Sequence, residues 1–194
     1  MASDNRDTVL IKQGEFGFTH FRDAHPRIMT VNLNYCVAVC GYDPESQVAF
    51  MSHFDFPVTM RNLKNQLQTV CEFVQFNGVG TGKRVSSFQC RVVGGKPVAI
   101  AQSKRMRRNA FQILRDLNNE WGTKTGHWNW FSFDEAADPL RKVGDKPLHF
   151  GVDCRTGEYF NADPQSVSRT SWNLQSKLVY RPEFFPSKGR VAVG

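Results

Sequence analysis

Apolar residues alternate with polar turn signals in the first third of the chain, and together they predict a β-hairpin. Residues 36–40 form an apolar run, and residues 47–53 form a second, mostly apolar one. Between them, residues 43–46 read Asp-Pro-Glu-Ser, which is typical of a tight turn. Because a hairpin brings its first and last residues together, we expect Cys36 and His53 to lie near each other across the pair.

Two later segments repeat apolar residues at the spacing of an amphipathic helix. The first helix is predicted to begin near residues 58–59 and to stop at residues 77–78. The second is predicted over residues 103–121, with Gly122 as its stop. The positions expected to face the core are Met60, Leu63, Leu67, Val70, Cys71 and Val74 in the first helix, and Met106, Ala110, Ile113, Leu114, Leu117 and Trp121 in the second.

The remaining apolar segments are short, and turn residues separate them. We predict further strands over residues 8–12, 15–19, 28–31, 85–93, 96–101 and 148–152, a turn over 153–158, and a strand or a wrapping arm over 169–180. Short strands in the majority, together with two helices, predict an α+β fold. We expect a mixed, largely antiparallel β-sheet sandwich with the two main helices packed outside.

A chain of 194 residues is long enough for one well-cored domain. We expect a flexible N-terminus over residues 1–8, a single domain over 9–165, and a basic C-terminal extension over 166–194. Within the domain, residues 123–145 are rich in aromatic side chains and are interpreted as an insertion. Its aromatic residues are expected either to pack on the core or to line a recognition groove.

The chain carries no apolar run long enough for a membrane span, and its first residues do not resemble a signal peptide. Five cysteines in no disulfide pattern indicate reduced thiols. We therefore expect a cytoplasmic protein.

Positive charge is concentrated in the middle of the chain. The formal net charge is +7, and residues 83–124 contain ten basic residues but only two acidic ones. Four cations fall in the first turn of the second predicted helix, where they oppose the helix dipole. We interpret Arg105, Arg107 and Arg108 as a surface that binds an acidic region of a protein partner; a basic surface that only faces water is the alternative. Nucleic acid is not expected as a partner, because no nucleic-acid-binding motif accompanies the charge.

A cysteine and a histidine at the end of the predicted hairpin are the minimum for nucleophilic chemistry. An ordinary thiol is mostly protonated at neutral pH, so a neighbouring imidazole is needed to take its proton. Cys40 falls on the same strand face as Cys36 but deeper, and we predict that it is a core residue. A zinc site formed by Cys36, Cys40 and His53 is the alternative, although no fourth ligand has a suitable spacing. We expect no metal and no organic cofactor.

The residues around the hairpin resemble a known protein family. Cys-Val-Ala-Val-Cys at 36–40, the Asp-Pro turn, and Met-x-His-Phe shortly before a proline are similar to the CheD family of chemoreceptor glutamine deamidases. Thr30 lies six positions before Cys36, and His53 lies seventeen positions after it, which matches the spacing in that family. The catalytic core also looks like that of secreted deamidase toxins, namely Burkholderia lethal factor and the cytotoxic necrotizing factors.

The resemblance implies that Thr30, Cys36 and His53 form a catalytic set. It implies a hydrolase of amide bonds, a protein-glutamine deamidase that converts a glutamine side chain of a target protein to glutamate through a cysteine thioester. The family usually has Gly-Ser before the nucleophile, whereas this chain has Asn34-Tyr35. A pair such as Gly94-Gly95 lies near the active site in that family. We expect these two pairs to contact the substrate.

Three functions stay open at this point. The first is deamidation of a chemoreceptor or of another protein. The second is the same chemistry in an effector or toxin that acts on a host protein and is secreted without a signal peptide. The third is a binding module that has kept the fold and lost catalysis. Transglutamination and thioester hydrolysis use the same nucleophile and differ only in the acceptor.

Overall fold

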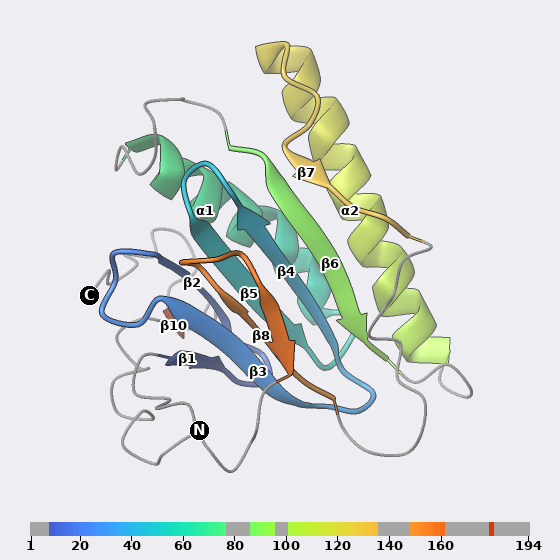
Figure 1. Cartoon of the computed structure of the whole chain (residues 1–194). Coiled ribbons are helices and arrows are strands. Elements are labelled where there is room, and N and C mark those ends of the chain that lie inside the picture. Colours follow the sequence, from blue (N-terminus) through green and yellow to red (C-terminus); the bar gives the residue numbers. More distant parts are fainter. Residues whose placement is uncertain (1–7, 77–85, 96–100, 136–147, 162–178, 181–194) are drawn as a thin grey trace.

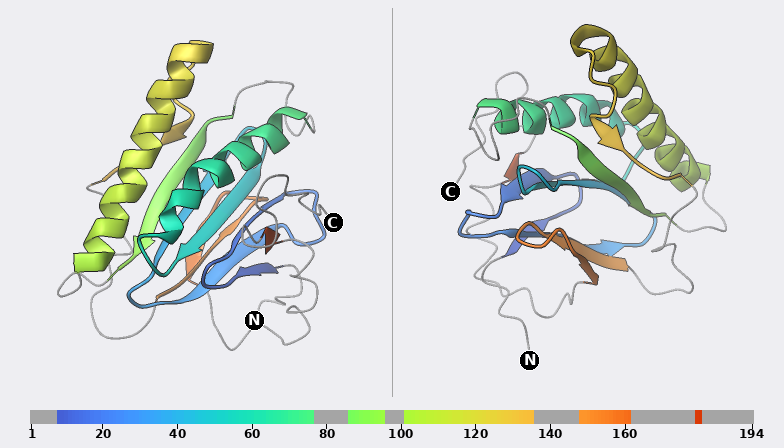
Figure 2. Two further views of the ribbon diagram at one scale, coloured as in Figure 1. Left: turned by 180° about the vertical axis from the view of Figure 1, so that it is seen from behind. Right: turned by 45° about the horizontal axis from the view of Figure 1, so that its top comes forward.

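The computed structural model describes residues 8–76, 86–95, 101–135, 148–161 and 179–180. Their elements form three layers, namely two helices, a six-stranded sheet and a four-stranded sheet (Figure 1, Figure 2). The six-stranded sheet lies in the middle, with both helices on one face and the four-stranded sheet on the other. This arrangement confirms the predicted α+β sandwich with two outer helices.

The six-stranded sheet has the order β10-β2-β5-β4-β6-β7. Its strands are β2 (Phe16–His20), β4 (Val37–Asp43), β5 (Val48–Phe54), β6 (Phe88–Gly94), β7 (Phe131–Ser132) and β10 (Val179–Tyr180). The four-stranded sheet has the order β1-β3-β8-β9, with β1 (Thr8–Ile11), β3 (Arg27–Leu33), β8 (Leu148–Asp153) and β9 (Tyr159–Asn161). Most neighbours are antiparallel, while β1–β3 and β6–β7 are parallel pairs, so the sheets are mixed as predicted.

The predicted hairpin is formed by β4 and β5 in the middle of the six-stranded sheet (Figure 1). Its register pairs Val37 with Phe54 and Ala38 with His53. Because side chains alternate along a strand, Val37 and Phe54 face the helices, while Ala38 and His53 face the four-stranded sheet. The face that carries His53 therefore lies between the two sheets.

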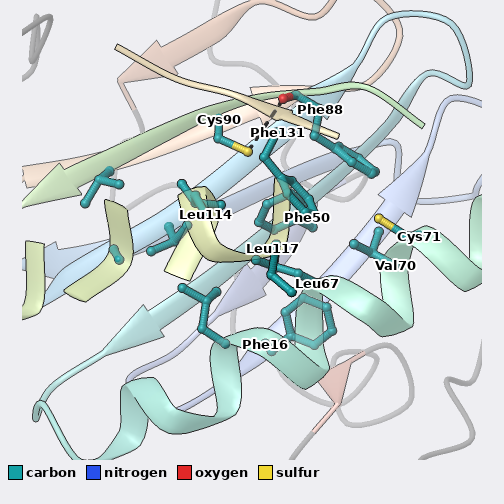
Figure 3. Packing of buried hydrophobic residues seen from close by; sticks show 14 of the residues in the cluster. Phe16, Phe50, Leu67, Val70, Cys71, Phe88, Cys90, Leu114, Leu117 and Phe131 are labelled. Carbon is teal, nitrogen blue, oxygen red and sulfur yellow. Dashed lines mark hydrogen bonds between the residues drawn. The ribbon is translucent and has the colours of Figure 1, made fainter. Parts of the chain in front are cut away.

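The core between the helices and the six-stranded sheet is rich in phenylalanine (Figure 3). Phe16, Phe50 and Phe88 come from three different strands, and all are fully buried. The rings of Phe50 and Phe88 meet edge to face, with 5.2 Å between their centres. Leu67 and Leu114 from the two helices close this layer. Such a core fixes the hairpin firmly against the helices.

The first predicted helix is confirmed. A short 3-10 turn, η2 (Thr59–Asn62), leads directly into α1 (Leu63–Phe76). The six positions predicted to face the core are all buried in the structure, namely Met60, Leu63, Leu67, Val70, Cys71 and Val74. The predicted stop at residues 77–78 lies outside the described residues.

The second helix, α2 (Ala101–Thr125), is longer than predicted at both ends. Gly122 does not stop the helix but lies buried within it. The ring of Trp128 folds back against this position, so a side chain at residue 122 would collide with it. The predicted stop was wrong because this glycine makes room for a ring rather than reversing the chain. The strand predicted over 96–101 is wrong at Ala101, which begins α2; residues 96–100 lie outside the described residues.

Part of the predicted aromatic insertion packs on the core. Trp130 and Phe131 are buried, and Trp121 of α2 meets the Trp130 ring edge-on with 5.2 Å between ring centres. Trp128 stays 57% exposed. Residues 136–147 and most of the predicted C-terminal extension lie outside the described residues, except that β10 pairs with β2.

A second core fills the space between the two sheets, with Ile11, Ile28, Met51 and Phe150 fully or almost fully buried. Cys40 belongs to this layer, as predicted, and burial raises the pKa of its thiol to about 12. None of the helices in the described part of the chain has the length and apolar character needed to cross a bilayer.

Candidate active site

His53 and Thr30 meet across the layer between the two sheets. The ring Nδ1 of His53, on β5, lies 2.8 Å from the hydroxyl oxygen of Thr30, on β3. The same hydroxyl donates to the backbone carbonyl of Ile11, on β1, at 2.7 Å. Ile11 and Thr30 are neighbours in the parallel β1–β3 pair, and both are fully buried. Two of the three predicted catalytic residues are thus in direct contact.

These two contacts decide which nitrogen of His53 carries the proton. A carbonyl oxygen can only accept, so the single hydroxyl proton of Thr30 goes to Ile11. The hydroxyl oxygen can then only accept from His53, which places the proton of the neutral ring on Nδ1. The other nitrogen, Nε2, has an open lone pair and no hydrogen-bond partner among the described residues. Nε2 is therefore the nitrogen at which the neutral ring can accept a proton.

Cys36 lies just before β4 on the same face of the hairpin as His53. The ladder pairs Ala38 with His53, so Cys36 is two residues away from the position directly opposite the histidine. Diagonal neighbours of this kind have Cα atoms about 7–8 Å apart across the two strands. Cys36 is half-buried and packs at the edge of the core between the sheets, whereas the other four cysteines are buried.

Burial makes both groups uncharged at rest. Burial, followed by the negative charge of Asp55, raises the pKa of the Cys36 thiol, while the residue's own backbone N–H partly offsets that rise. Burial lowers the pKa of His53 to about 4, although Asp55 and the carbonyl of Ile11 oppose that change. At neutral pH the pair is therefore a thiol and a neutral imidazole rather than an ion pair.

Two contacts from other elements hold the backbone around Cys36. The amide of Gly95 donates to the Cys36 carbonyl at 3.0 Å, and the hydroxyl of Ser103, in the first turn of α2, donates to the Tyr35 carbonyl at 2.7 Å. Gly94 has a φ of +90°, and a Cβ there would lie 2.6 Å from the Cys36 carbonyl oxygen. The glycine pair thus lies against the backbone of Cys36, and its predicted contact with substrate stays a prediction.

Asn34 and Tyr35 lie in the connection between β3 and β4, next to Cys36. Tyr35 is 45% exposed, so its side chain lies at the surface next to Cys36 in the sequence. The Oδ1 atom of Asn34 is buried and has no hydrogen-bond partner among the described residues. Their predicted contact with substrate remains a prediction.

The three arginines predicted to bind substrate differ in position. Arg107 turns inward, and its guanidinium donates to the carbonyls of Val92 at 2.8 Å and Gly94 at 3.2 Å, so that it holds the end of β6. Arg105 and Arg108 are exposed on α2.

A surface hollow of about 690 Å³ lies beside Arg105. Phe56 and Val58, which are 53% and 60% exposed, line it together with Pro57 and the α2 residues Ala101, Gln102 and Asn109. This hollow combines apolar side chains with one cation, and it begins two residues after β5, the strand that carries His53.

Sequence reasoning missed several contributors to the site. Asp55 follows the predicted hairpin and was given no role, Ser103 was expected only as the start of the second helix, and Ile11 only as part of the strand over residues 8–12. The hairpin register could have pointed to Asp55, because the position after Phe54 falls opposite Cys36. The roles of Ser103 and Ile11 depend on contacts with Tyr35 and Thr30, which are distant in the sequence and leave no local pattern.

The part of the chain that the structure describes holds no group of three or more histidine, cysteine, aspartate or glutamate side chains arranged to bind a metal ion.

Comparison with known proteins gives one line of support for the resemblance. No family model matches the chain. A stretch of 54 residues is 43% identical to a protein of Shewanella oneidensis named probable chemoreceptor glutamine deamidase CheD 2. The stretch is 28% of this chain and 25% of that protein, so the match spans about a quarter of the length of the curated relative. Over this part of its length, the chain is similar to a chemoreceptor glutamine deamidase, as the sequence predicted.

Proposed function

We propose that this protein is a protein-glutamine deamidase in which Cys36 is the nucleophile, His53 the acid and base, and Thr30 the residue that orients the imidazole. The observation that carries the proposal is the Thr30–His53 hydrogen bond, because it leaves Nε2 free as a base on the sheet face that also carries Cys36. The partial similarity to a protein named as a deamidase supports the same reaction class.

In the first half of the proposed reaction, the Cys36 thiol gives its proton to Nε2 of His53 as the sulfur attacks the carboxamide carbon of a glutamine. A tetrahedral intermediate forms, and the backbone N–H of Cys36 is the donor that we expect to stabilise its oxyanion. The carbon–nitrogen bond then breaks, and the imidazolium returns the proton to the leaving nitrogen. Ammonia departs, and a thioester remains on Cys36.

In the second half, neutral His53 takes a proton from water as the water oxygen attacks the thioester carbon. The carbon–sulfur bond breaks, the thiol is restored, and the product is a glutamate side chain that loses its proton at neutral pH. No step requires a metal or an organic cofactor. The target gains a negative charge, which alters any interface in which the glutamine takes part.

We propose that the target protein docks on the surface formed by Tyr35, Phe56, Val58 and Arg105. The apolar side chains would contact the segment that carries the glutamine, and Arg105 would pair with an acidic residue of the same protein. Arg108 would add to the positive field, whereas Arg107 acts on the fold through its bonds to β6. A chemoreceptor is the substrate that the name of the partial relative suggests, and a host protein is the alternative.

A comparison of cellular proteins after expression of the wild type and of Cys36→Ser tests the function. We expect glutamines converted to glutamate in the first sample and not in the second, because a serine hydroxyl is far less readily deprotonated than a thiol. Peptide mass spectrometry detects the conversion. Cys71→Ser is the matched control, since that cysteine is buried in the helix-side core and should leave the conversion unchanged.

Thiol labelling separates an enzyme from a silent binding module on the same fold. We expect iodoacetamide to modify Cys36 well before the four buried cysteines, and His53→Gln to slow that modification. If Cys36 reacts no faster than the buried thiols and no glutamine is converted, catalysis has been lost.

A further inference from the structure

Asp55 directly follows β5, and the hairpin register brings it to the nucleophile. The last pair of the ladder is Val37–Phe54, so one further step sets Asp55 opposite Cys36. Strand alternation also puts Asp55 on the same side as His53, two residues earlier. At this position the negative charge of Asp55 raises the pKa of Cys36 and, against the larger effect of burial, that of His53.

Two other segments donate hydrogen bonds to Asp55, and a third, η2, lies close to it. Gln13, in the connection between β1 and β2, donates from its amide nitrogen to Oδ2 at 3.0 Å, and Thr59 of η2 lies at the longer distance of 3.5 Å from Oδ1. Gln102 of α2 donates to the backbone carbonyl of Asp55 at 3.2 Å. A carboxylate offers about four acceptor positions, so it can still accept from a further donor.

The reaction proposed above changes the charge of the bound side chain. The substrate carboxamide is neutral and its NH₂ group is a donor, whereas the product carboxylate is an anion that can only accept. The Asp55 carboxylate beside Cys36 can accept a hydrogen bond from the carboxamide NH₂ group, and its negative charge repels the product carboxylate. We propose that Asp55 is a specificity-determining residue, which favours the glutamine carboxamide in the site over the carboxylate that it becomes. This inference rests on the proposed deamidation for its biological meaning.

Two small alkylating reagents test the inference without a protein substrate. Iodoacetamide and iodoacetate both form a sulfur–carbon bond with the thiolate as iodide leaves, and they differ only in carrying a carboxamide or a carboxylate. We expect the ratio of their rates at Cys36, divided by the same ratio for free cysteine, to be well above one in the wild type. In Asp55→Asn it should fall by about threefold or more, the factor expected when one charge at short range is removed. Peptide mass spectrometry of Cys36 gives both rates.

Two further variants separate the local charge from other effects. Asp116→Asn removes the same charge from α2 about 20 Å along the helix from Ser103, and it should leave the ratio unchanged. Asp55→Glu keeps the charge and should preserve most of the selectivity. Circular dichroism melts of all variants show whether each one is folded.

The inference is overturned if wild-type Cys36 shows the selectivity of free cysteine, or if Asp55→Asn leaves the ratio as it was. Its failure can be told apart from a failure of the proposed function. A charge-dependent ratio in a protein that converts no glutamine would support the role of Asp55 and reject deamidation. Normal glutamine conversion in a protein whose alkylation ratio does not depend on Asp55 would support deamidation and reject the role of Asp55.

Discussion

A single hydroxyl group determines the chemistry available at His53. Without Thr30, either ring nitrogen could carry the proton of the neutral imidazole. With Thr30 bound to the Ile11 carbonyl, the proton of the neutral ring stays on Nδ1, and Nε2 is the nitrogen that can accept a further proton. A β-branched threonine also has a restricted χ1 angle, so little rotamer freedom is lost when this geometry forms.

Thr30→Val tests this role at the scale of one atom. Valine keeps the shape of threonine but cannot accept from His53 or donate to Ile11, so we expect the deamidation rate to fall by at least about tenfold. The two groups left unpaired should also destabilise the fold by roughly 1–3 kcal/mol. Initial rates of glutamine conversion and urea unfolding give the two quantities.

Thr30→Ser keeps the hydroxyl and serves as the matched variant. It should recover most of the activity even if it recovers less of the stability, because serine lacks the packed methyl group. Equal activity in the valine and serine variants would contradict the orienting role.

The low pKa of His53 predicts a pH dependence of stability. Burial lowers this pKa from 6.5 to about 4, so between these values the unfolded chain binds a proton that the folded chain does not. The stabilisation associated with neutral His53 is complete above about pH 6.5 and is lost as the pH falls to about 4, by up to about 3 kcal/mol. Urea unfolding at pH 7.5 and at pH 4.5 measures this loss, which should be smaller in His53→Gln. Equal losses in the two proteins would show that His53 titrates normally.

The pairing of the hairpin could be predicted from the sequence, whereas the position of Asp55 beside Cys36 was missed. The hairpin residues form a local pattern, so the approach of Cys36 and His53 followed from turn chemistry alone. Thr30 was chosen only through the family spacing, because its contact with His53 depends on how two separate sheets stack. Asp55 lies at a strand end next to Phe56 and Pro57, where an acidic residue in a turn has no distinctive pattern.

At the scale of elements, the proposed nucleophile Cys36 is a loop residue supported by a strand end and a helix. Gly95, the residue after β6, contributes its amide and α2 contributes the Ser103 hydroxyl. Arg107 of α2 also binds the Val92 and Gly94 carbonyls of β6. These contacts limit the movement of the backbone at Cys36. Preorganisation of this kind is what a nucleophile needs in order to attack without reorganising the site.

Two glycine substitutions separate backbone strain from disturbance of the site. Gly94→Ala places a side chain in a positive-φ conformation and also brings its Cβ to 2.6 Å from the Cys36 carbonyl. Gly14→Ala has a similar φ of +79° but meets nothing within 4 Å. We expect the second to cost about 1–2 kcal/mol, and the first to cost more and to lower the deamidation rate as well. Equal unfolding free energies would mean that the loop adapts easily around residue 94.

The elements themselves were predictable to different degrees. α1 followed from its apolar spacing, and every predicted inward position is buried. The end of α2 could not be predicted from the sequence, because a glycine in a helix can mark either its end or a close contact with another group. At Gly122 it is a close contact, made by the ring of Trp128, which lies after the helix in the sequence. A contact that forms only after the chain folds back leaves no periodic signal.

At the scale of the whole molecule, the candidate site belongs to the layer between the sheets rather than to the larger core under the helices. Cys36 and His53 come from the middle sheet, and Thr30 and Ile11 come from the outer one. The distance between the two sheets therefore sets the hydrogen bond that orients the base. The helices secure the middle sheet and the Cys36 loop, but they do not contact Thr30 or His53 through any hydrogen bond found in the described residues.

Comparing one substitution in each core tests which layer controls activity. Ile28 lies two residues before Thr30 on β3 and is fully buried between the sheets. Leu114 belongs to α2 and is fully buried in the core between the helices and the six-stranded sheet. Ile28→Val should cost about 0.5–1.5 kcal/mol and Leu114→Ala about 2–5 kcal/mol of stability. If sheet spacing controls the site, the milder substitution should reduce the deamidation rate more, measured at a temperature where both proteins are folded. Activity losses that follow the order of the stability losses would instead indicate that the site responds only to the general rigidity of the fold.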